Sequence, residues 1–372
     1  MLGQMKHSWK SLLTAMTYED RPFKASPYSP TTTPAPFFVI QVPLMRSLAL
    51  SSALCLALSP IATNAAEKPK QLVMISFDGA GANNLWRRSR DTAKRVNAHF
   101  TYFLSCTLVI ERKNAKSYQG PHQKPGRSNI GFAQTAEEAR ERLGHIWQAH
   151  LEGHDISSHT CGHFDGKDWT TADWTAELNT FHDVLTDAWR TVGAEAQEPA
   201  GWKDFVANDI RGFRAPYFST SAGMVEAEKK AGILYDASLV TKGPAMPEEK
   251  SGLIRFGLPL IPEGPSNRPI IGMDYNLFVR HSAGIDNPGR SAEFEERAYA
   301  AFRAAFDRQY EGDRIPLQLG FHFVEMNGGA YWRAMERLVT EVCGKEDVAC
   351  VSYSQAVKLI REREKQQETS GL

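Results

Sequence analysis

Residues 71–79 read QLVMISFDG, and the fold prediction starts from this segment. Its apolar run at 72–77 is short, which is typical of a buried strand of a parallel sheet. From here to the end of the chain, strand-like and helix-like patterns alternate. Repeated strand-then-helix units predict an α/β fold. We expect an irregular (β/α) barrel of seven or eight parallel strands with a loop-rich insertion.

Each expected strand is short, and most are followed by a polar turn and a helix-like pattern. We expect strands at 72–77, 100–104, 154–158, 212–214, 233–237, 317–324 and 348–353. We expect helices at 84–98, 136–152, 175–192, 222–231, 291–310, 331–342 and 354–365. Thr135 followed by Glu138 is typical of a capping box at the start of one of these helices.

Two stretches lack a regular pattern. Residues 111–135 are rich in Lys, Asn, Gly, Pro and Ser and predict a long loop. A loop of this length inside a domain is usually functional. Residues 241–290 are rich in proline, and we interpret them as the loop-rich insertion over one rim of the barrel.

The first residues of the chain are typical of an export signal. Residues 48–58 read LALSSALCLAL, follow Met45 and Arg46, and precede small residues at 62–66. This order describes a secretory signal peptide, and the run is too short to cross a hydrocarbon core of ~30 Å. We expect a signal peptide at 45–66 and an exported mature protein, periplasmic or secreted, at 67–372. Residues 1–44 are expected to be a non-native or disordered extension, with a long cytoplasmic extension as the alternative.

The cysteines agree with export. Without Cys55 an even number remains, which suits an oxidising compartment. Cys343 and Cys350 are close in sequence across a polar loop, so we pair them, and Cys106 then pairs with Cys161 by default. Four buried free thiols are the alternative.

The overall charge excludes several function classes. Lys plus Arg and Asp plus Glu both number 43, so the net charge is +0 and offers no global footprint for nucleic acid or an anionic membrane. Hydrophobic residues at 42% and charged residues at 23% are ordinary for a globular protein. This composition excludes overall disorder and a multi-span membrane protein.

Four short motifs stand at the carboxyl ends of expected strands, where barrel enzymes place catalytic groups. They are SFDG at 76–79, HTCGH at 159–163, RAPY at 214–217 and LGFH at 319–322. Together and in this order they resemble the polysaccharide deacetylases of carbohydrate esterase family 4, in particular their chitin-deacetylase-like branch. The resemblance covers roughly residues 71–360, so 67–372 is expected to be a polysaccharide deacetylase domain.

The resemblance implies a metal-dependent hydrolase. His159 and His163 would bind a divalent ion, most simply Zn²⁺, because paired neutral imidazoles suit it. Ordinary core or helix-surface histidines are the alternative. Gly79 departs from the family pattern, which has a second aspartate there as a metal ligand. Three alternatives follow: the ion is held by two histidines plus solvent, or Asp78 is a ligand, or a nearby carboxylate such as Asp165 or Asp168 substitutes.

The resemblance also implies the catalytic roles. Asp78 would be the general base that activates the metal-bound water, and Arg214 would pair with it. Tyr217 would stabilise the oxyanion through its backbone N–H, and His322 would be the general acid. For each of these residues a turn, rim or packing role is the alternative.

Further residues have a looser match. Asp274 is similar to the family acid that orients the late-strand histidine, with an ordinary loop aspartate as the alternative. Three tryptophans would offer stacking faces to a sugar or would pack in the core, namely Trp169, Trp174 and Trp332.

The implied substrate is an N-acetylated amino sugar in a polysaccharide or oligosaccharide of the chitin or peptidoglycan type, with no nucleic acid and no stable membrane span. A catalytically weak or inactive carbohydrate-binding protein of the same fold is one alternative, motivated by Gly79. A phosphodiesterase of the alkaline phosphatase superfamily is the other, since its first strand also ends in Asp-Gly. That class needs a later Asp-His pair with a suitable ligand set, which we do not find here.

Overall fold

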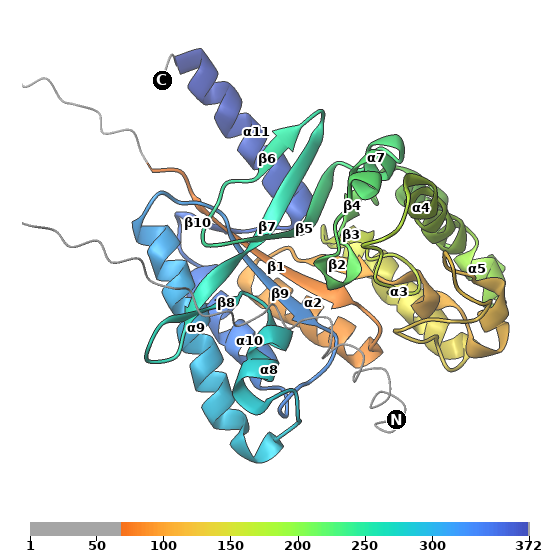
Figure 1. Cartoon of the computed structure of the whole chain (residues 1–372), viewed down its shortest axis with the longest axis horizontal. Coiled ribbons are helices and arrows are strands. Elements are labelled where there is room, and N and C mark those ends of the chain that lie inside the picture. Colours follow the sequence, from red (N-terminus) through yellow and green to blue (C-terminus); the bar gives the residue numbers. More distant parts are fainter. Residues whose placement is uncertain (1–67, 371–372) are drawn as a thin grey trace, which may run out of the picture. The chain divides into compact units, whose positions relative to one another are not determined.

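The computed structural model describes residues 68–370 (Figure 1), so the predicted extension and signal peptide lie outside the described residues. The centre of the sheet is β1 (Gln71–Gly79), in which every residue is buried. β1 pairs in parallel with β9 (Leu317–His322), while its beginning pairs with β10 (Val348–Cys350) and its end with β2 (Thr101–Leu104). These neighbours explain why residues 72–77 are apolar apart from Ser76.

From β2 the parallel pairing continues strand by strand around a curled sheet. The order is β3 (Asp155–Ser158), β4 (Gly212–Phe213), β5 (Tyr235–Thr241) and β7 (Leu253–Glu263). Hydrogen bonds through Gly272 link β7 to β9. The Gly272 N–H donates to Pro259 O of β7, and the Gly320 N–H of β9 donates to Gly272 O. The sheet is a half-barrel with mostly parallel strands, and this confirms the predicted fold class.

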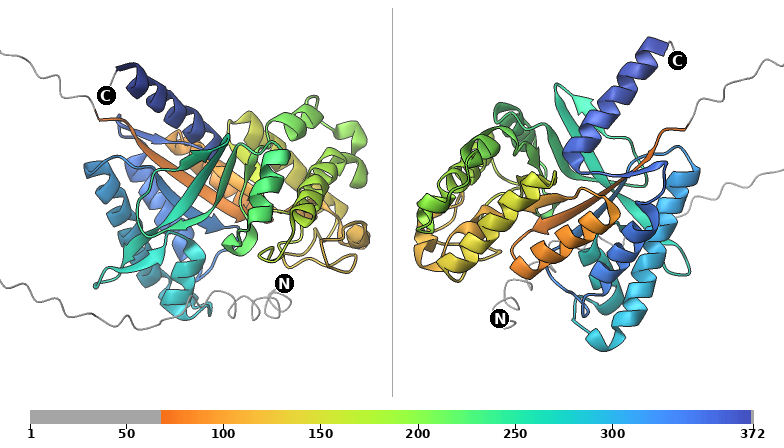
Figure 2. Two further views of the ribbon diagram at one scale, coloured as in Figure 1. Left: turned by 45° about the horizontal axis from the view of Figure 1, so that its top comes forward. Right: turned by 180° about the vertical axis from the view of Figure 1, so that it is seen from behind.

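Helices cover the outside of the half-barrel. Between the strands lie α2 (Asn83–Val96), α3 (Ala136–Leu151), α4 (Thr171–Thr186), α5 (Ala188–Thr191), α6 (Trp202–Asn208), α7 (Ala222–Lys230), α8 (Asp274–Ser282), α9 (Ser291–Glu311) and α10 (Ala330–Val342). α2, α3, α9 and α10 lie on the outer side of the sheet (Figure 2). Short 3₁₀ turns follow β2, namely η1 (Cys106–Val109) and η2 (Arg112–Ser117). Within residues 68–370 no helix is long and apolar enough to span a membrane.

The last helix, α11 (Tyr353–Ser370), fills the inside of the half-barrel with its first turns. One hydrophobic cluster combines residues of α11 with inward-facing strand residues: Leu72, Met74, Phe103, Tyr235, Ala237, Ile254, Phe256, Tyr353, Ala356, Val357 and Ile360. The Tyr353 ring stacks on Tyr235 with 5.4 Å between centroids. These apolar side chains occupy one end of the interior of the half-barrel. The polar ends of the strands, where the motifs stand, lie at the other end. The later turns of α11 project away from the sheet (Figures 1 and 2).

The region 241–290 is more regular than the predicted loop-rich insertion. It contains β7, the antiparallel strands β6 (Glu248–Lys250) and β8 (Arg268–Ile271), and α8. Proline composition concealed β7, although Pro259 and Pro262 are tolerated there. Pro259 takes part through its carbonyl oxygen, and Pro262 lies in the short hairpin with β8, so neither position depends on an N–H.

Both predicted disulfides are present, and the alternative of four free thiols is wrong. Cys106–Cys161 joins the segments that follow β2 and β3, and Cys343–Cys350 joins the end of α10 to β10. The predicted capping box at Thr135 is half formed. Its side chain accepts the Glu138 N–H at 3.1 Å, but the Glu138 carboxylate accepts from the Gln134 N–H instead of that of Thr135.

The buried His154 makes the fold sensitive to acid. Its Nδ1 accepts the Phe100 N–H at 2.9 Å, so the imidazole must be neutral. Burial, with the neighbouring His99, lowers the pKa of His154 to about 4, although Glu152 opposes this and Arg90 adds to it. Below pH ~6.5 the unfolded chain therefore binds a proton at His154 that the folded chain does not bind until pH ~4.

We expect the free energy of unfolding to fall by on the order of 3 kcal/mol between pH 7 and pH 4 through His154 alone. Urea unfolding at a series of pH values measures this loss. In His154→Asn the amide oxygen keeps an acceptor for the backbone N–H and does not titrate, so this variant should lose less stability over the same range. Equal slopes for the two proteins would contradict the assignment.

Candidate active site

The four sequence motifs meet at the carboxyl ends of neighbouring strands. β1 and β9 are in register so that Asp78 lies beside His322. His159 and His163 follow β3, and Arg214 follows β4. The fold therefore brings together residues that are up to 244 positions apart in the chain, since His322 minus Asp78 is 244.

Backbone strain is concentrated at these strand ends. Five residues other than glycine adopt positive φ values between 53° and 60° just after β1, β3 and β4: Ala80, Thr160, His163, Tyr217 and Phe218. The left-handed conformation costs such a residue roughly 1–2 kcal/mol. Residues held in it by the surrounding structure cluster at functional sites.

Arg214 is the buried centre of the site, with none of its surface exposed. Its Nη1 donates to Asp78 Oδ1 at 2.7 Å and to Ser76 Oγ at 2.9 Å. Its Nε donates to Ala237 O, and its Nη2 donates to the Tyr353 hydroxyl, both at 3.1 Å. The guanidinium thus connects β1, β5 and α11, and its rigid fork holds the Asp78 carboxylate in one orientation.

The charges around Asp78 keep it ionised. Burial alone would raise the pKa of Asp78, but the positive charge of Arg214 outweighs burial and lowers it. Arg214 binds Oδ1 rather than Oδ2. The site therefore contains an anionic carboxylate whose second oxygen is not engaged by the guanidinium.

His159 and His163 are held as a pair of neutral imidazoles. The Nδ1 of His159 lies 2.7 Å from Arg214 O, so it carries the proton and Nε2 keeps its lone pair. The two rings are 4.9 Å apart between centroids. Burial lowers the pKa of His159, and burial with the nearby His159 lowers the pKa of His163 to about 3. Neutral imidazole is the form that binds a metal ion.

The segment between the two histidines is fixed from the side of β2. The His159 N–H donates to Leu104 O at 2.8 Å, and the Cys106 N–H donates to Thr160 O at 3.1 Å. The Thr107 hydroxyl donates to the carbonyl oxygen of the disulfide-bonded Cys161 at 2.9 Å.

Glu177 of α4 fixes the same segment from the other side, and sequence reasoning missed it. Its Oε1 accepts the N–H of Cys161 at 2.8 Å and of Gly162 at 3.2 Å, and the Tyr118 hydroxyl at 2.9 Å. Glu177 is 1% exposed. The sequence carries one signal of its burial. Glu177 lies on the apolar face of a helix, next to Leu178 and within about one turn of buried aromatic residues.

His322 has its own buried carboxylate. Its Nδ1 lies 2.7 Å from Asp274 Oδ1, and its backbone N–H donates to Asp274 Oδ2 at 2.8 Å. Burial would lower the pKa of His322, but Asp274 outweighs it and raises the pKa. The side chain is 27% exposed, so Nε2 is accessible from solvent. The contact with Asp274 agrees with the looser match in the sequence.

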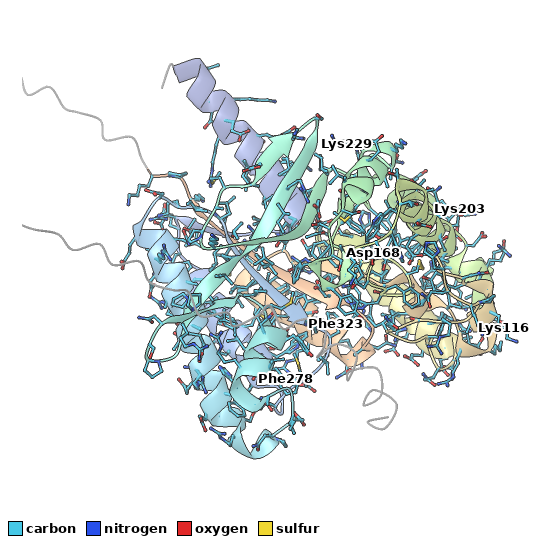
Figure 3. All side chains as sticks on the ribbon, viewed as in Figure 1. Lys116, Asp168, Lys203, Lys229, Phe278 and Phe323 are labelled. Carbon is cyan, nitrogen blue, oxygen red and sulfur yellow. A yellow bond between two sulfur atoms is a disulfide. The ribbon has the colours of Figure 1, made fainter. Side chains whose placement is uncertain are left out.

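The set of ligands fits a divalent ion in part. His159 and His163 offer two nitrogen donors in the right protonation state, as described above. Among residues 68–370, however, no three His, Cys, Asp or Glu side chains are grouped so that they could share one ion. Asp165 and Asp168 are both exposed, and Asp165 accepts the Ser219 hydroxyl at 2.6 Å. Figure 3 labels Asp168 among the side chains of the molecule.

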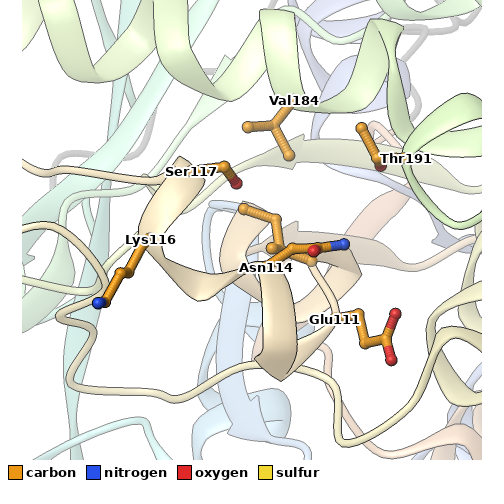
Figure 4. Close-up of a pocket in the computed structure, with 7 residues that line it drawn as sticks. Glu111, Asn114, Lys116, Ser117, Val184 and Thr191 are labelled. Carbon is orange, nitrogen blue, oxygen red and sulfur yellow. The ribbon is translucent and has the colours of Figure 1, made fainter.

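Neither the three tryptophans nor a cavity beside η2 offers an open binding surface at the strand ends. Trp174 and Trp332 are 0% and 1% exposed and Trp169 is 8% exposed, so all three pack in the core rather than offer stacking faces. A cavity of about 350 Å³ lies between η2 and the helices α4 and α5 (Figure 4). Asp78, Arg214 and the three histidines at the strand ends do not line it.

Comparisons with known proteins give matches among solved structures alone. No family model matches the chain, and no curated protein matches it in sequence. A putative polysaccharide deacetylase from Mycobacterium smegmatis is 17% identical, with a TM-score of 0.49 over 80% of this chain and 93% of that one. A peptidoglycan deacetylase from Bacillus subtilis is 11% identical, with a TM-score of 0.41 over 81% and 97%.

A CE4 family pseudoenzyme from Bacillus anthracis is 9% identical, with a TM-score of 0.41 over 77% of this chain and 66% of that one. The structures to which this chain is similar thus include both polysaccharide deacetylases and a pseudoenzyme. At this degree of likeness, the functional argument rests on the residues of the site itself.

The pairing of Arg214 with Asp78 predicts an asymmetric effect on stability. Arg214→Met should lower the free energy of unfolding by about 3–5 kcal/mol, because it leaves a buried carboxylate without its partner. Asp78→Asn combined with Arg214→Met should recover a large part of this loss. Urea unfolding gives the free energy of unfolding of both variants. A double variant no more stable than Arg214→Met alone would contradict the pairing.

Glu177 predicts a local effect on the histidine segment. Glu177→Ala removes the acceptor of two buried N–H groups, at a cost of about 1–3 kcal/mol. The amide hydrogens of Cys161 and Gly162 should then exchange with solvent roughly tenfold faster or more. Glu177→Gln keeps an oxygen in the same position and should preserve protection. Equal exchange rates in the two variants would show that Glu177 does not hold the segment.

Proposed function

We propose that this protein is a hydrolase that removes acetyl groups from N-acetylated amino sugars in a polysaccharide of the chitin or peptidoglycan type. One observation carries the proposal: Asp78 and His322 lie side by side, and each contacts its own buried partner, Arg214 and Asp274 respectively. Arg214 favours the ionised carboxylate, and Asp274 favours the protonated imidazole. Two groups with environments that separate their pKa values in this way are typical of a general base and a general acid.

Asp78 is the proposed general base. Its carboxylate is ionised and fixed by Arg214 through Oδ1. The other oxygen, Oδ2, is the one that takes the proton of a water that attacks the acetyl carbonyl. Proton transfer to a positioned side chain typically contributes about 10²–10⁴-fold to the rate.

His322 is the proposed general acid. Asp274 binds Nδ1, so the proton to be transferred is the one on Nε2. This nitrogen delivers it to the sugar amine as the acetyl C–N bond breaks, and acetate and a free amine are the products. Tyr217, in the strained turn after Pro216, is proposed to help with its backbone N–H at the oxyanion.

His159 and His163 are the residues that would hold a divalent ion, for which Zn²⁺ is the first choice. Such an ion, when bound, polarises a carbonyl and lowers the pKa of water. The hydrogen bond from Nδ1 of His159 to Arg214 O orients Nε2, the nitrogen that would bind the ion. The hydrogen bonds of the histidine segment with β2 and with Glu177 would fix the spacing of the two rings. The two disulfides support the proposal of an exported protein, because such bonds persist in oxidising compartments.

A carbohydrate-binding protein of the same fold, with weak or no catalysis, is the second candidate. Gly79 favours it, since no other carboxylate among the described residues completes a three-ligand group. Binding without turnover would distinguish this candidate from the first.

Acetate release from N-acetylated chito-oligomers tests the proposal, with added Zn²⁺ and again after chelation. We expect release that the chelator stops. His322→Ala should lower turnover by about 10²-fold or more while Zn²⁺ stays bound, because only the proton donor is lost. His159→Ala should abolish Zn²⁺ binding.

Two results would contradict this assignment. Zn²⁺ retained at unchanged affinity in His159→Ala would refute the metal site. Oligomer binding without any acetate release would favour the carbohydrate-binding protein.

A further inference from the structure

The turn that follows Arg214 contains two strained residues in succession. Tyr217 and Phe218 have φ values of 59° and 55°, in the left-handed region. Residues that carry a Cβ keep this conformation only where surrounding contacts hold them. The hydrogen bonds of the turn itself are short-range: the Phe218 N–H donates to Ala215 O at 3.2 Å, and the Ser219 N–H donates to Pro216 O at 3.1 Å. Because bonds of this type have poor geometry, contacts from outside the turn are needed to fix it.

The beginning of the turn is fixed by β5. The Ala215 N–H donates to Ser238 Oγ at 2.8 Å. The N–H of Ser238 donates in turn to the Asp236 carboxylate at 2.9 Å, and both side chains are buried. These bonds hold the residue before the strained pair. The other end of the turn, at Ser219, needs a partner of its own.

Asp165 is that partner. The Ser219 hydroxyl donates to Asp165 Oδ1 at 2.6 Å, and the same oxygen accepts the Lys167 N–H at 3.1 Å. A hydrogen bond to a carboxylate is about twice as strong as one between neutral groups. Asp165 follows His163 in the same segment, after Phe164. The contact therefore joins the end of the strained turn to the segment that carries both histidines.

The middle of the turn is attached to the same segment. The Tyr217 ring packs edge-on against the His163 ring, with 4.9 Å between centroids. The side-chain amide of Asn129 lies 3.4 Å from the Tyr217 hydroxyl and donates to His163 O at 3.0 Å. The strained turn after β4 and the histidine segment after β3 are thus connected at more than one point, and the shortest of these contacts is that of Ser219 with Asp165.

We propose that Asp165 is a positioning residue, which through Ser219 holds the strained turn and so fixes the direction of the Tyr217 backbone N–H. This inference rests on the proposed function, because that N–H is proposed to act at the oxyanion. It gives a structural task to a carboxylate that the sequence offers as a substitute metal ligand. Since Asp165 is exposed, its removal should loosen the turn without opening the core.

Hydrogen exchange of backbone amides tests the holding contact on the purified chain without substrate. Ser219→Ala removes the hydroxyl donor, and the amides of residues 218 and 219 should then exchange about tenfold faster or more. Asp165→Ala should have the same effect, and the double variant should exchange no faster than either single one. Asp165→Asn keeps an oxygen acceptor and should remain close to the wild type. The amides of β1 are the control and should exchange equally in all these proteins.

Acetate release from N-acetylated chito-oligomers gives a second readout, which a merely structural role would not change. A displaced oxyanion donor weakens binding of the transition state but not of the substrate. In Ser219→Ala and Asp165→Ala we therefore expect kcat to fall about tenfold at unchanged KM. The fall is smaller than the loss of about 10²–10³-fold on removing an oxyanion donor, because the N–H remains in the chain.

The outcomes are distinct. Wild-type exchange at residues 218 and 219 in both alanine variants would overturn the contact as the one that holds the turn. Exchange in Asp165→Asn as fast as in Asp165→Ala would overturn the hydrogen bond as its cause. Faster exchange with unchanged kcat would overturn the positioning role. A wild type that releases no acetate contradicts the proposed function instead, and the exchange rates still decide whether Asp165 holds the turn.

Discussion

The site depends on one buried ion pair, that of Arg214 with Asp78. A guanidinium without exposed surface is tolerated inside the half-barrel because every side of it has a partner: a carboxylate, a serine hydroxyl, a tyrosine hydroxyl and a backbone carbonyl. Burying this charge is favourable only while all these partners are in place. Since they come from β1, β5 and α11, the ion pair can form only when the barrel is assembled around it. The Asp78 carboxylate is thus oriented by the same contacts that define the fold.

Electrostatics divide the site into two halves with different charge states. On the side of β1 and β9, each titratable group has an opposite charge beside it, and both Asp78 and His322 favour their ionised forms. On the side of β3, the histidines are surrounded by a carbonyl, aromatic rings and each other, and both favour the neutral form. The strand order places these opposite charge states side by side at one end of the sheet.

The sequence predicted those parts of the molecule that depend on local pattern. The buried strand at 72–77, the strand–helix alternation and the four motifs at strand ends can be found from residue type and spacing, and so can the cysteine pair at 343 and 350. The contact of Arg214 with Asp78 followed from the family resemblance, because the two residues are far apart in the chain. β7 was concealed by its prolines, since proline content says nothing about which carbonyl groups pair.

The residues that sequence reasoning missed act through tertiary contacts. In the sequence Glu177 cannot be distinguished from other helix glutamates, because its three hydrogen-bond donors are distant in the chain. The same holds for Ile130, whose side chain lies next to Gly79 in the fold. The missing aspartate at residue 79 was visible in the sequence. The side chain that lies next to residue 79 was not visible in the sequence, because it depends on how a long loop returns over the strand ends.

The Cys106–Cys161 bond has a topological consequence for the loop over the site. The two cysteines are 55 positions apart, and the long segment 111–135 lies entirely between them. That segment, with Asn129 and Ile130, is therefore part of a covalently closed ring together with α3 and β3. A protease that cuts one peptide bond in this loop opens the ring but releases no fragment. The nicked protein would keep its mass under non-reducing conditions, with both histidines still tied to the end of β2.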